Sequence, residues 1–149
     1  MIEAYDSTMT REGFSSGTMS HAWGTAPITG VVNGIMGLTQ TAPAFATFDV
    51  KPKLGGVASA SVKVPTPHGS IVINATATST AVDIPCNTRA SLCAMVPPQG
   101  QVANAGLQLA LDGEILMADA FRIDGNHACV DQVGCGAAGG LRTVEWVKA

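Results

Sequence analysis

The sequence predicts a mainly β protein: an antiparallel β-sandwich preceded by an irregular loop and one helix. Most of the chain after residue 44 consists of short segments in which apolar and polar residues alternate, separated by turn residues. One earlier stretch instead carries its apolar residues at the spacing of a helix. Residues 1–20 show neither period and are rich in Ser, Thr and Gly. Seven or eight short strands after a single helix are typical of a sandwich with a helical preface.

The helix is predicted from residue 28, because five apolar residues recur at i, i+3, i+4, i+7 and i+8. These residues are Ile28, Val31, Val32, Ile35 and Met36. Thr25 can cap the helix, Pro27 suits its first turn, and Gly37 can end it. Gly30 and Gly34 each weaken an isolated helix by roughly 1 kcal/mol relative to alanine. We therefore expect the helix to need a closely packed partner.

The strands are predicted from alternation and from the turns between them. Segments 58–64 and 70–78 alternate on either side of a Pro-rich turn at 65–69, which predicts a hairpin. Asp112-Gly113 predicts a second hairpin, between strands at 107–111 and 114–117. Further strands are predicted at 82–85, 90–96, 127–133 and 141–147. The Thr/Pro-rich stretch 39–43 is predicted to be a linker.

Composition excludes several functional classes. The chain has 149 residues, which predicts one domain, and only 13% of them are charged. With a net charge of −3 and no Lys/Arg cluster, neither a nucleic acid nor an anionic membrane is expected as a partner. No apolar run reaches the roughly 18 residues of a membrane span. The first residues lack the basic start and apolar centre of a signal peptide.

The four cysteines, Cys86, Cys93, Cys129 and Cys135, lie in the C-terminal half. Their spacing differs from that of common zinc sites, so we predict two disulfides, with buried thiols as the alternative. Three pairings are possible. We slightly prefer the pairing that closes two small loops, Cys86 with Cys93 and Cys129 with Cys135. A Cys93–Cys135 bond would instead join adjacent strands. Disulfides imply an oxidising, extracellular location.

Two further sequence patterns bear on modification and cofactors. Asn74-Ala75-Thr76 is an N-glycosylation sequon, although such triplets are common by chance. The glycine-rich segment 134–140 lacks the helix and lysine of a nucleotide site. His127 adjoins Cys129 without completing a ligand set, and His68 lies in the turn at 65–69, where its ring can fix the turn. We expect neither a metal nor a cofactor.

Several motifs resemble those of bacterial-type α-L-rhamnosidases. The sequence SHAWGTAP at 20–27 is similar to a motif near the end of that family's catalytic barrel, and VPTPHGSI at 64–71 is similar to the most recognisable stretch of its C-terminal β-sandwich. Further similar motifs follow the family's order: PAF at 43–45 with Phe48, VKP at 50–52, IPCNT at 84–88 and VGCG at 133–136. The order and spacing agree over most of the chain.

The resemblance implies a division of the chain. Residues 1–40 would be a remnant of the catalytic (α/α)6 barrel, comprising a loop and the last helix, and residues 41–149 would be the C-terminal β-sandwich. Ala44 departs from the family, which often has glycine at this position. The barrel itself would be missing, so the barrel or a full-length relative becomes an expected partner.

The resemblance also implies an inverting glycoside hydrolase, which needs one carboxyl group to donate a proton and another to activate water. Glu3 matches the place of the general base, and we expect the general acid to lie outside this chain. His21 can hydrogen-bond a sugar hydroxyl, and Trp23 offers a flat apolar face to a deoxy sugar. Without such a role, Glu3 would be an ordinary solvated residue, Trp23 a core residue and His21 its hydrogen-bonded neighbour.

Three functions remain open from the sequence. The first is the C-terminal portion of an α-L-rhamnosidase-like protein, inactive by itself, that acts on rhamnose-containing glycans in the complete enzyme. The second is a secreted rhamnose- or glycan-binding module, which the small number of seven aromatic residues makes less attractive. The third is a non-catalytic docking or decoy partner of a full-length relative. In that case the apolar stripe of Ile28, Val31 and Ile35 would stay partly exposed.

Overall fold

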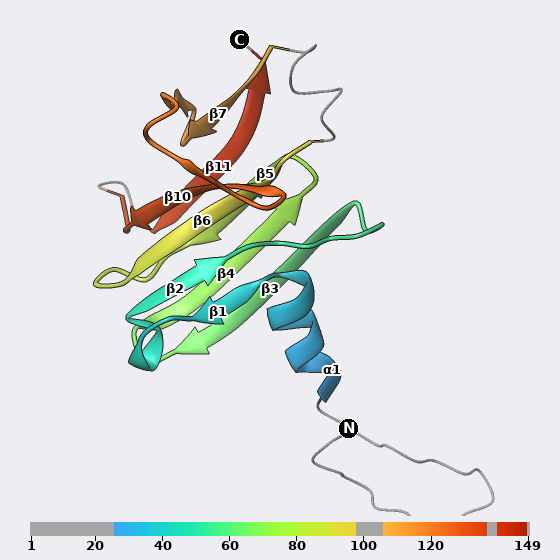
Figure 1. Ribbon diagram of the computed structural model, residues 1–149. Coiled ribbons are helices and arrows are strands. Elements are labelled where there is room, and N and C mark those ends of the chain that lie inside the picture. The colour runs from blue at the N-terminus through green and yellow to red at the C-terminus, as the bar shows by residue number, and fades with distance from the viewer. Residues whose placement is uncertain (1–25, 98–105, 137–139, 149) are drawn as a thin grey trace, which may run out of the picture.

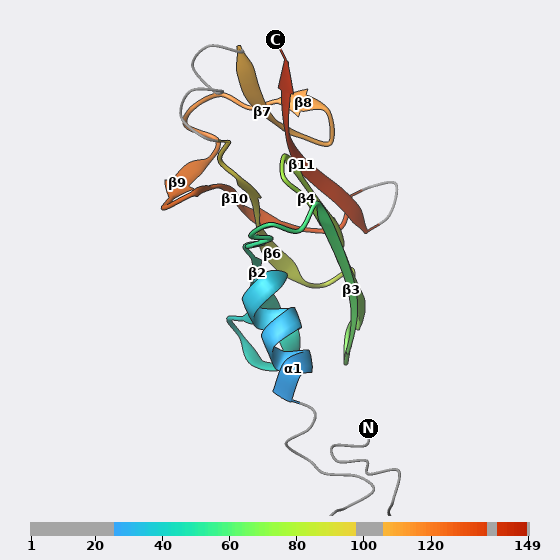
Figure 2. The same cartoon turned by 90° about the vertical axis from the view of Figure 1, so that its right-hand side faces the viewer.

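The chain forms two β-sheets packed face to face, with one helix at the N-terminal end (Figures 1 and 2). This computed structural model describes residues 26–97, 106–136 and 140–148. Its helical elements are α1 (Ala26–Thr29), the π-helix η2 (Gly30–Ile35) and the 3-10 turn η3 (Pro43–Phe45). Its strands are β1 (Leu38–Gln40), β2 (Thr47–Val50), β3 (Ser59–Thr66), β4 (Gly69–Thr76), β5 (Ser79–Asp83), β6 (Arg89–Met95), β7 (Leu107–Leu111), β8 (Glu114–Ile115), β9 (Arg122–Asp124), β10 (His127–Val133) and β11 (Leu141–Lys148).

The predicted sandwich is confirmed. The first sheet has the strand order β1-β2-β6-β10-β9, and the second has the order β3-β4-β5-β11-β7-β8. Both predicted hairpins are present, as β3–β4 and β7–β8. Neighbouring strands are antiparallel except β2 and β6, which are parallel with Val50 beside Leu92. Alternation within a strand does not reveal its neighbours, so this parallel contact was not predicted.

Three short strands escaped the sequence analysis: β1, β2 and β9. β1 lies partly in the stretch predicted as a linker, yet its Leu38 is buried and pairs with Val50 of β2. β9 is only three residues long and fully exposed, so it shows no apolar alternation. β1 and β9 are at the edges of the first sheet, where pairing on one side suffices, and β2 lies between β1 and β6. Strands this short carry too few residues to display a period.

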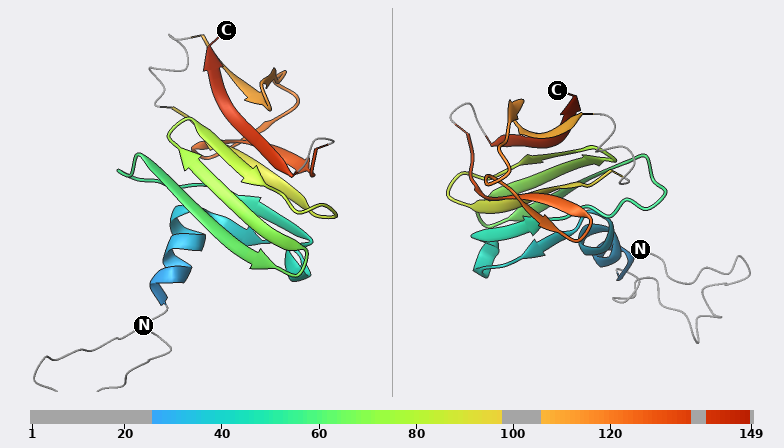
Figure 3. Two further views of the ribbon diagram at one scale, coloured as in Figure 1. Left: turned by 180° about the vertical axis from the view of Figure 1, so that it is seen from behind. Right: turned by 45° about the horizontal axis from the view of Figure 1, so that its top comes forward.

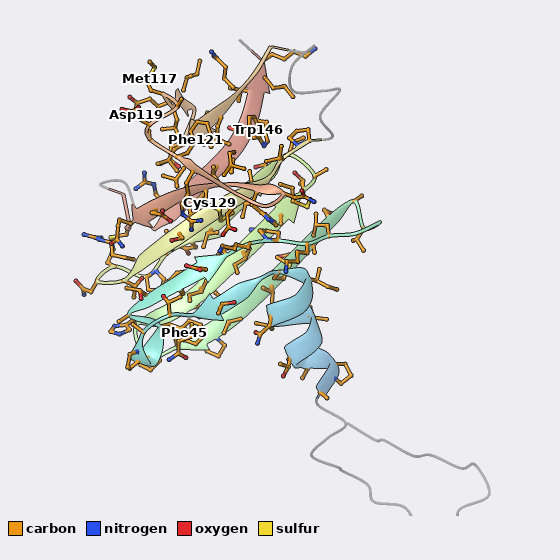
Figure 4. All side chains as sticks on the ribbon, viewed as in Figure 1. Phe45, Met117, Asp119, Phe121, Cys129 and Trp146 are labelled. Carbon is orange, nitrogen blue, oxygen red and sulfur yellow. A yellow bond between two sulfur atoms is a disulfide. The ribbon has the colours of Figure 1, made fainter. Side chains whose placement is uncertain are left out.

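The core lies between the sheets and consists of alternate residues from each strand. Phe48, Leu92, Ile71, Ile73 and Val144 are all buried at 1% exposure or less. Two further groups, Phe45 at one end of the sandwich and Phe121 with Trp146 near the other, are partly buried against this core (Figure 4). Trp146 of β11 also donates from Nε1 to the Met95 carbonyl of β6 at 2.9 Å. This bond joins the two sheets.

The predicted helix exists, but its second half is π-helical. The Met36 amide donates to the Val31 carbonyl, five residues back, at 3.0 Å. This wide turn delivers Met36 into the core, where it is fully buried. Gly37 then adopts φ +63°, a left-handed conformation that suits glycine and ends the helix as predicted. A Cβ at residue 37 would also collide with the Lys51 backbone.

Ala44 occupies the position where the resemblance implies glycine, and its φ of 58° and ψ of 20° explain that preference. A left-handed conformation costs a non-glycine residue about 1–2 kcal/mol. We expect Ala44→Gly to raise the free energy of unfolding by up to about 1 kcal/mol, after the greater chain entropy of glycine is subtracted. Urea denaturation tests this. The control Ala60→Gly in β3 should destabilise, and a loss in both variants would contradict the prediction.

Candidate functional site

The three residues predicted to contact substrate, Glu3, His21 and Trp23, lie outside the described residues, as does the predicted helix cap Thr25. Their roles therefore remain predictions. The structure does describe the helix that follows them, from Ala26. This helix projects from the sandwich, with the N-terminal end of α1 farthest from the strands (Figure 1).

The apolar stripe of that helix is split between core and surface. Met36 is buried, and Val32 and Ile35 pack partly against the core. Ile28 and Val31, however, are 55% and 42% exposed. We call these two residues the helix patch. Added methyl groups at Gly30 and Gly34 would meet no atom within 4 Å, so the described chain leaves this part of the helix uncovered.

A second candidate is a groove of about 780 Å³ at one end of the first sheet. It lies between the segment after β2, the end of β6 and the turn from β9 to β10. Its lining residues are Lys51, Pro52, Lys53, Gly55, Met95, Val96, Asp124, Gly125, Asn126 and His127. The His127 side chain is buried and hydrogen-bonds the Pro52 carbonyl through Nε2 at 2.7 Å, which fixes the groove wall.

A network of charges runs from the groove across the outer face of the first sheet. Lys51 Nζ contacts Asp124 Oδ2 at 2.7 Å, and Arg122 Nη1 contacts the same oxygen at 3.0 Å. Arg122 also holds Asp131 with two bonds, at 2.8 and 3.3 Å. The hydrogen bonds from Lys51 and then Arg122 lower the pKa of Asp124, and the bond from Arg122 lowers the pKa of Asp131. The hydrogen bond to Asp124 raises the pKa of Lys51.

One disulfide lies on the same face as this network. Cys93 of β6 and Cys129 of β10 are directly opposite each other, with Cα atoms 4.1 Å apart. Arg122 is paired with Cys129 on the other side of β10. Both cysteines are fully buried, and Figure 4 places Cys129 near the middle of the molecule. The charged side chains therefore help to cover this disulfide.

Two disulfides are present as predicted, but the preferred pairing was wrong. The bonds are Cys86–Cys135 and Cys93–Cys129, not the two small loops of Cys86–Cys93 and Cys129–Cys135. The reason is the strand order. β6 and β10 are neighbours although they are far apart in sequence, and local spacing does not reveal such neighbours.

Neither a metal cluster nor a membrane helix is found in the described ranges. Among residues 26–97, 106–136 and 140–148, no group of three or more His, Cys, Asp or Glu side chains is arranged to hold a metal ion. In the same part of the chain, no helix is both long and apolar enough to cross a membrane.

Comparison with known families finds a match in the first part of the sandwich. Residues 37–106 match the bacterial α-L-rhamnosidase C-terminal domain. The matched stretch is of the bacterial α-L-rhamnosidase C-terminal type. The matched stretch, which we call the rhamnosidase-type domain, begins at Gly37, immediately after the helix. No curated protein matches the chain.

Two solved rhamnosidases share the fold. An α-L-rhamnosidase from Dictyoglumus thermophilum matches with a TM-score of 0.68 and 16% identity, over 89% of this chain and 14% of that one. The Streptomyces avermitilis α-L-rhamnosidase, solved in complex with L-rhamnose, matches with a TM-score of 0.63 and 20% identity, over 99% of this chain and 14% of that one. The chain thus spans about one seventh of the length of either enzyme.

Sequence reasoning missed the groove at the end of the first sheet. Asp124-Gly125 is the same hairpin signal as Asp112-Gly113, which predicted the β7–β8 hairpin. It could have revealed the turn from β9 to β10 and placed Asp124 at its tip. Nothing in the sequence, however, indicated that Lys51, which follows β2, would reach Asp124 at the end of β9, three strands away in the sheet.

The charge network predicts a dependence of stability on pH. The folded pKa of Asp131 is below its unfolded value of about 3.9, so its contribution is present above pH 4 and lost as the pH falls through the folded pKa. We expect Asp131→Asn to be less stable than the parent at pH 7, by no more than about 1 kcal/mol because the pair is exposed, and the difference should shrink as the pH falls below 4. Urea midpoints from pH 7 to 2 measure this, with Glu114→Gln as a control for surface charge. A difference in stability between Asp131→Asn and the parent that does not change with pH would contradict the prediction.

Proposed function

We propose that the chain is the C-terminal portion of an α-L-rhamnosidase-like protein, with residues 1–40 supplying the last loop and helix of a catalytic helical barrel and residues 41–149 bracing that barrel. The observation that carries this proposal is the helix patch. An apolar helix stands directly before the rhamnosidase-type domain, and Ile28 and Val31 remain 55% and 42% exposed. Exposed apolar side chains at such a junction fit a surface that packs against further helices.

In the complete enzyme, Glu3 would act as the general base of an inverting hydrolysis of terminal α-L-rhamnosides. It would take a proton from the water that attacks the sugar, while a carboxylic acid from elsewhere protonates the leaving oxygen. His21 would hydrogen-bond a sugar hydroxyl, and Trp23 would stack on the apolar side of the ring. A single carboxyl group cannot supply both proton transfers. The 149-residue chain alone is therefore expected to be inactive.

The proposal includes secretion. Two disulfides per chain are compatible with an extracellular location, because disulfides persist in oxidising compartments. A rhamnose-bearing glycan or glycoside would be the substrate there.

Hydrolysis of a chromogenic α-L-rhamnoside tests the catalytic part of the proposal. We expect no turnover from the chain or from Glu3→Gln. When a form of the Streptomyces avermitilis enzyme that lacks the 14% matching this chain is added in excess, the chain should raise its activity and Glu3→Gln should not. Activity of the chain alone that Glu3→Gln abolishes would show that a second carboxyl group is present, and would contradict the proposed division.

The helix patch also favours a second function, that of a non-catalytic docking partner for a full-length relative. Binding to the intact Streptomyces enzyme, measured by light scattering, distinguishes it. Ile28→Asp should abolish docking, whereas Ile123→Asp, at a residue equally exposed on β9, should not. A strictly monomeric chain that binds neither form of the enzyme would exclude this function.

A glycan-binding module has less support. None of the described residues that line the groove is Trp, Tyr or Phe, the side chains on which sugar rings stack. Rhamnose binding therefore rests on Trp23, and a titration of its fluorescence with rhamnose measures it.

A further inference from the structure

We propose that Asn74 carries an N-linked glycan on the outer face of the second sheet. The sequon Asn74-Ala75-Thr76 lies in β4. The alternation of that strand turns the first and third residues of the sequon, Asn74 and Thr76, outward. Ala75 is 1% exposed and packs in the core, whereas Asn74 and Thr76 are exposed. Both side chains that define the sequon are thus on the surface.

The Asn74 amide is oriented for a glycan. Ser61 Oγ, on the neighbouring β3, donates to Asn74 Oδ1 at 2.7 Å. This hydrogen bond engages only the oxygen of the amide. The nitrogen Nδ2, to which a glycan is attached, takes no part in it. A glycan attached to Nδ2 would leave the bond between Ser61 and Asn74 intact.

The surface around Asn74 has room for a sugar. Its two neighbours in register are Ser61 on β3 and Ala81 on β5, both small. Ser59 and Ser79 extend this surface of small residues. Viewed from behind, the face formed by β3 and β4 is open, and none of the described segments passes in front of it (Figure 3, left).

The disulfides give independent support, because N-glycans are added in the same oxidising compartment in which disulfides form. In the transfer, Asn74 Nδ2 would form a bond to the anomeric carbon of an oligosaccharide carried by a lipid diphosphate. The bond from that carbon to the phosphate oxygen would break, the lipid diphosphate would leave, and Nδ2 would lose one proton.

The glycan would also protect a sheet edge. β3 is the first strand of the second sheet and pairs only with β4, so its outer side is free within the described chain. Free edges invite pairing between molecules. A glycan one strand inward from this edge would obstruct such pairing by its bulk.

Secretion of the 149-residue chain from yeast, behind a cleavable signal, tests the proposal. We expect a single decrease in mass after treatment with peptide N-glycosidase, and peptide mapping should find aspartate at position 74, the product of that enzyme. Asn74→Gln and Thr76→Ala should abolish the decrease. Thr76→Ser keeps the hydroxyl group and should still show the decrease in mass. Ser61→Ala, which removes only the hydrogen bond to Asn74, should show it too.

The peptide map of the unmutated chain decides between glycosylated and free Asn74 even if a variant fails to fold. Secreted chain with both disulfides formed and unmodified Asn74 would overturn the proposal, as would modification confined to another residue. Because this test does not involve hydrolysis or the helix patch, its outcome is independent of the proposed rhamnosidase function.

Discussion

Replacing Phe48 with alanine should lower the free energy of unfolding by about 3–5 kcal/mol, the usual cost of removing a buried phenyl ring. Phe48 is 1% exposed and lies on β2, between Gln40 of β1 and Ala90 of β6. Its ring meets the edge of Phe45, with centroids 6.3 Å apart. The truncation would leave a cavity between the sheets, because the surrounding strands hold one another in register.

Urea denaturation at pH 7 measures this effect. Val57→Ala, in an exposed loop, is a suitable control and should change stability by less than about 0.5 kcal/mol. Phe48→Leu should recover much of the loss, since it refills most of the volume. A loss below about 1 kcal/mol in Phe48→Ala would mean that β2 is not part of the cooperative core.

Removing the Cys93–Cys129 disulfide by a double substitution to alanine should cost about 4 kcal/mol. The bond closes a segment with a sequence separation of 36 residues, and the chain-entropy model assigns a loop of that length roughly this value. Cys86→Ala with Cys135→Ala is the matched control, because its separation of 49 residues gives a similar entropic term. Thermal melting of both double variants measures the two losses.

The two bonds should differ in their access to reductant. Cys86 is exposed, whereas Cys93 and Cys129 are fully buried beneath the charge network. Exchange requires a thiolate to reach the sulfur, so the Cys86–Cys135 bond should be reduced first in the folded chain. Alkylation at timed intervals, followed by peptide mapping, reports the order. Equal rates for the two bonds would contradict the burial of Cys93 and Cys129.

Prediction from sequence was most successful where a local pattern carried the information. Alternation in β3 and β4 indicated a half-buried hairpin, and Asp112-Gly113 marked the next one, because side-chain period and turn chemistry are local properties. The glycine at the helix end was likewise legible, since residue 37 requires a left-handed backbone.

What the sequence left open depends on which strands become neighbours. The disulfide pairing follows from the contact between β6 and β10, and the groove follows from Lys51 approaching Asp124 across the first sheet. Such contacts are decided by the packing of the whole sandwich. The predicted sugar contacts, Glu3, His21 and Trp23, rest on motif resemblance, because local patterns indicate only a loop there.

The position of β6 governs how the chain must fold. Leu92 of β6 pairs with Val50 on one side and with Val130 on the other, and both partners are distant in sequence. The hairpin of β3 and β4, closed by a two-residue turn, instead forms between adjacent segments. Sheets built from strands that are distant in sequence have high contact order and fold slowly. The chain loses entropy when it closes the long loops, before the stabilising contacts between the strands form. During synthesis, β2 therefore cannot pair until β6 has been made, and β6 cannot pair with β10 until β10 has been made. The first sheet is completed only after most of the domain has left the ribosome.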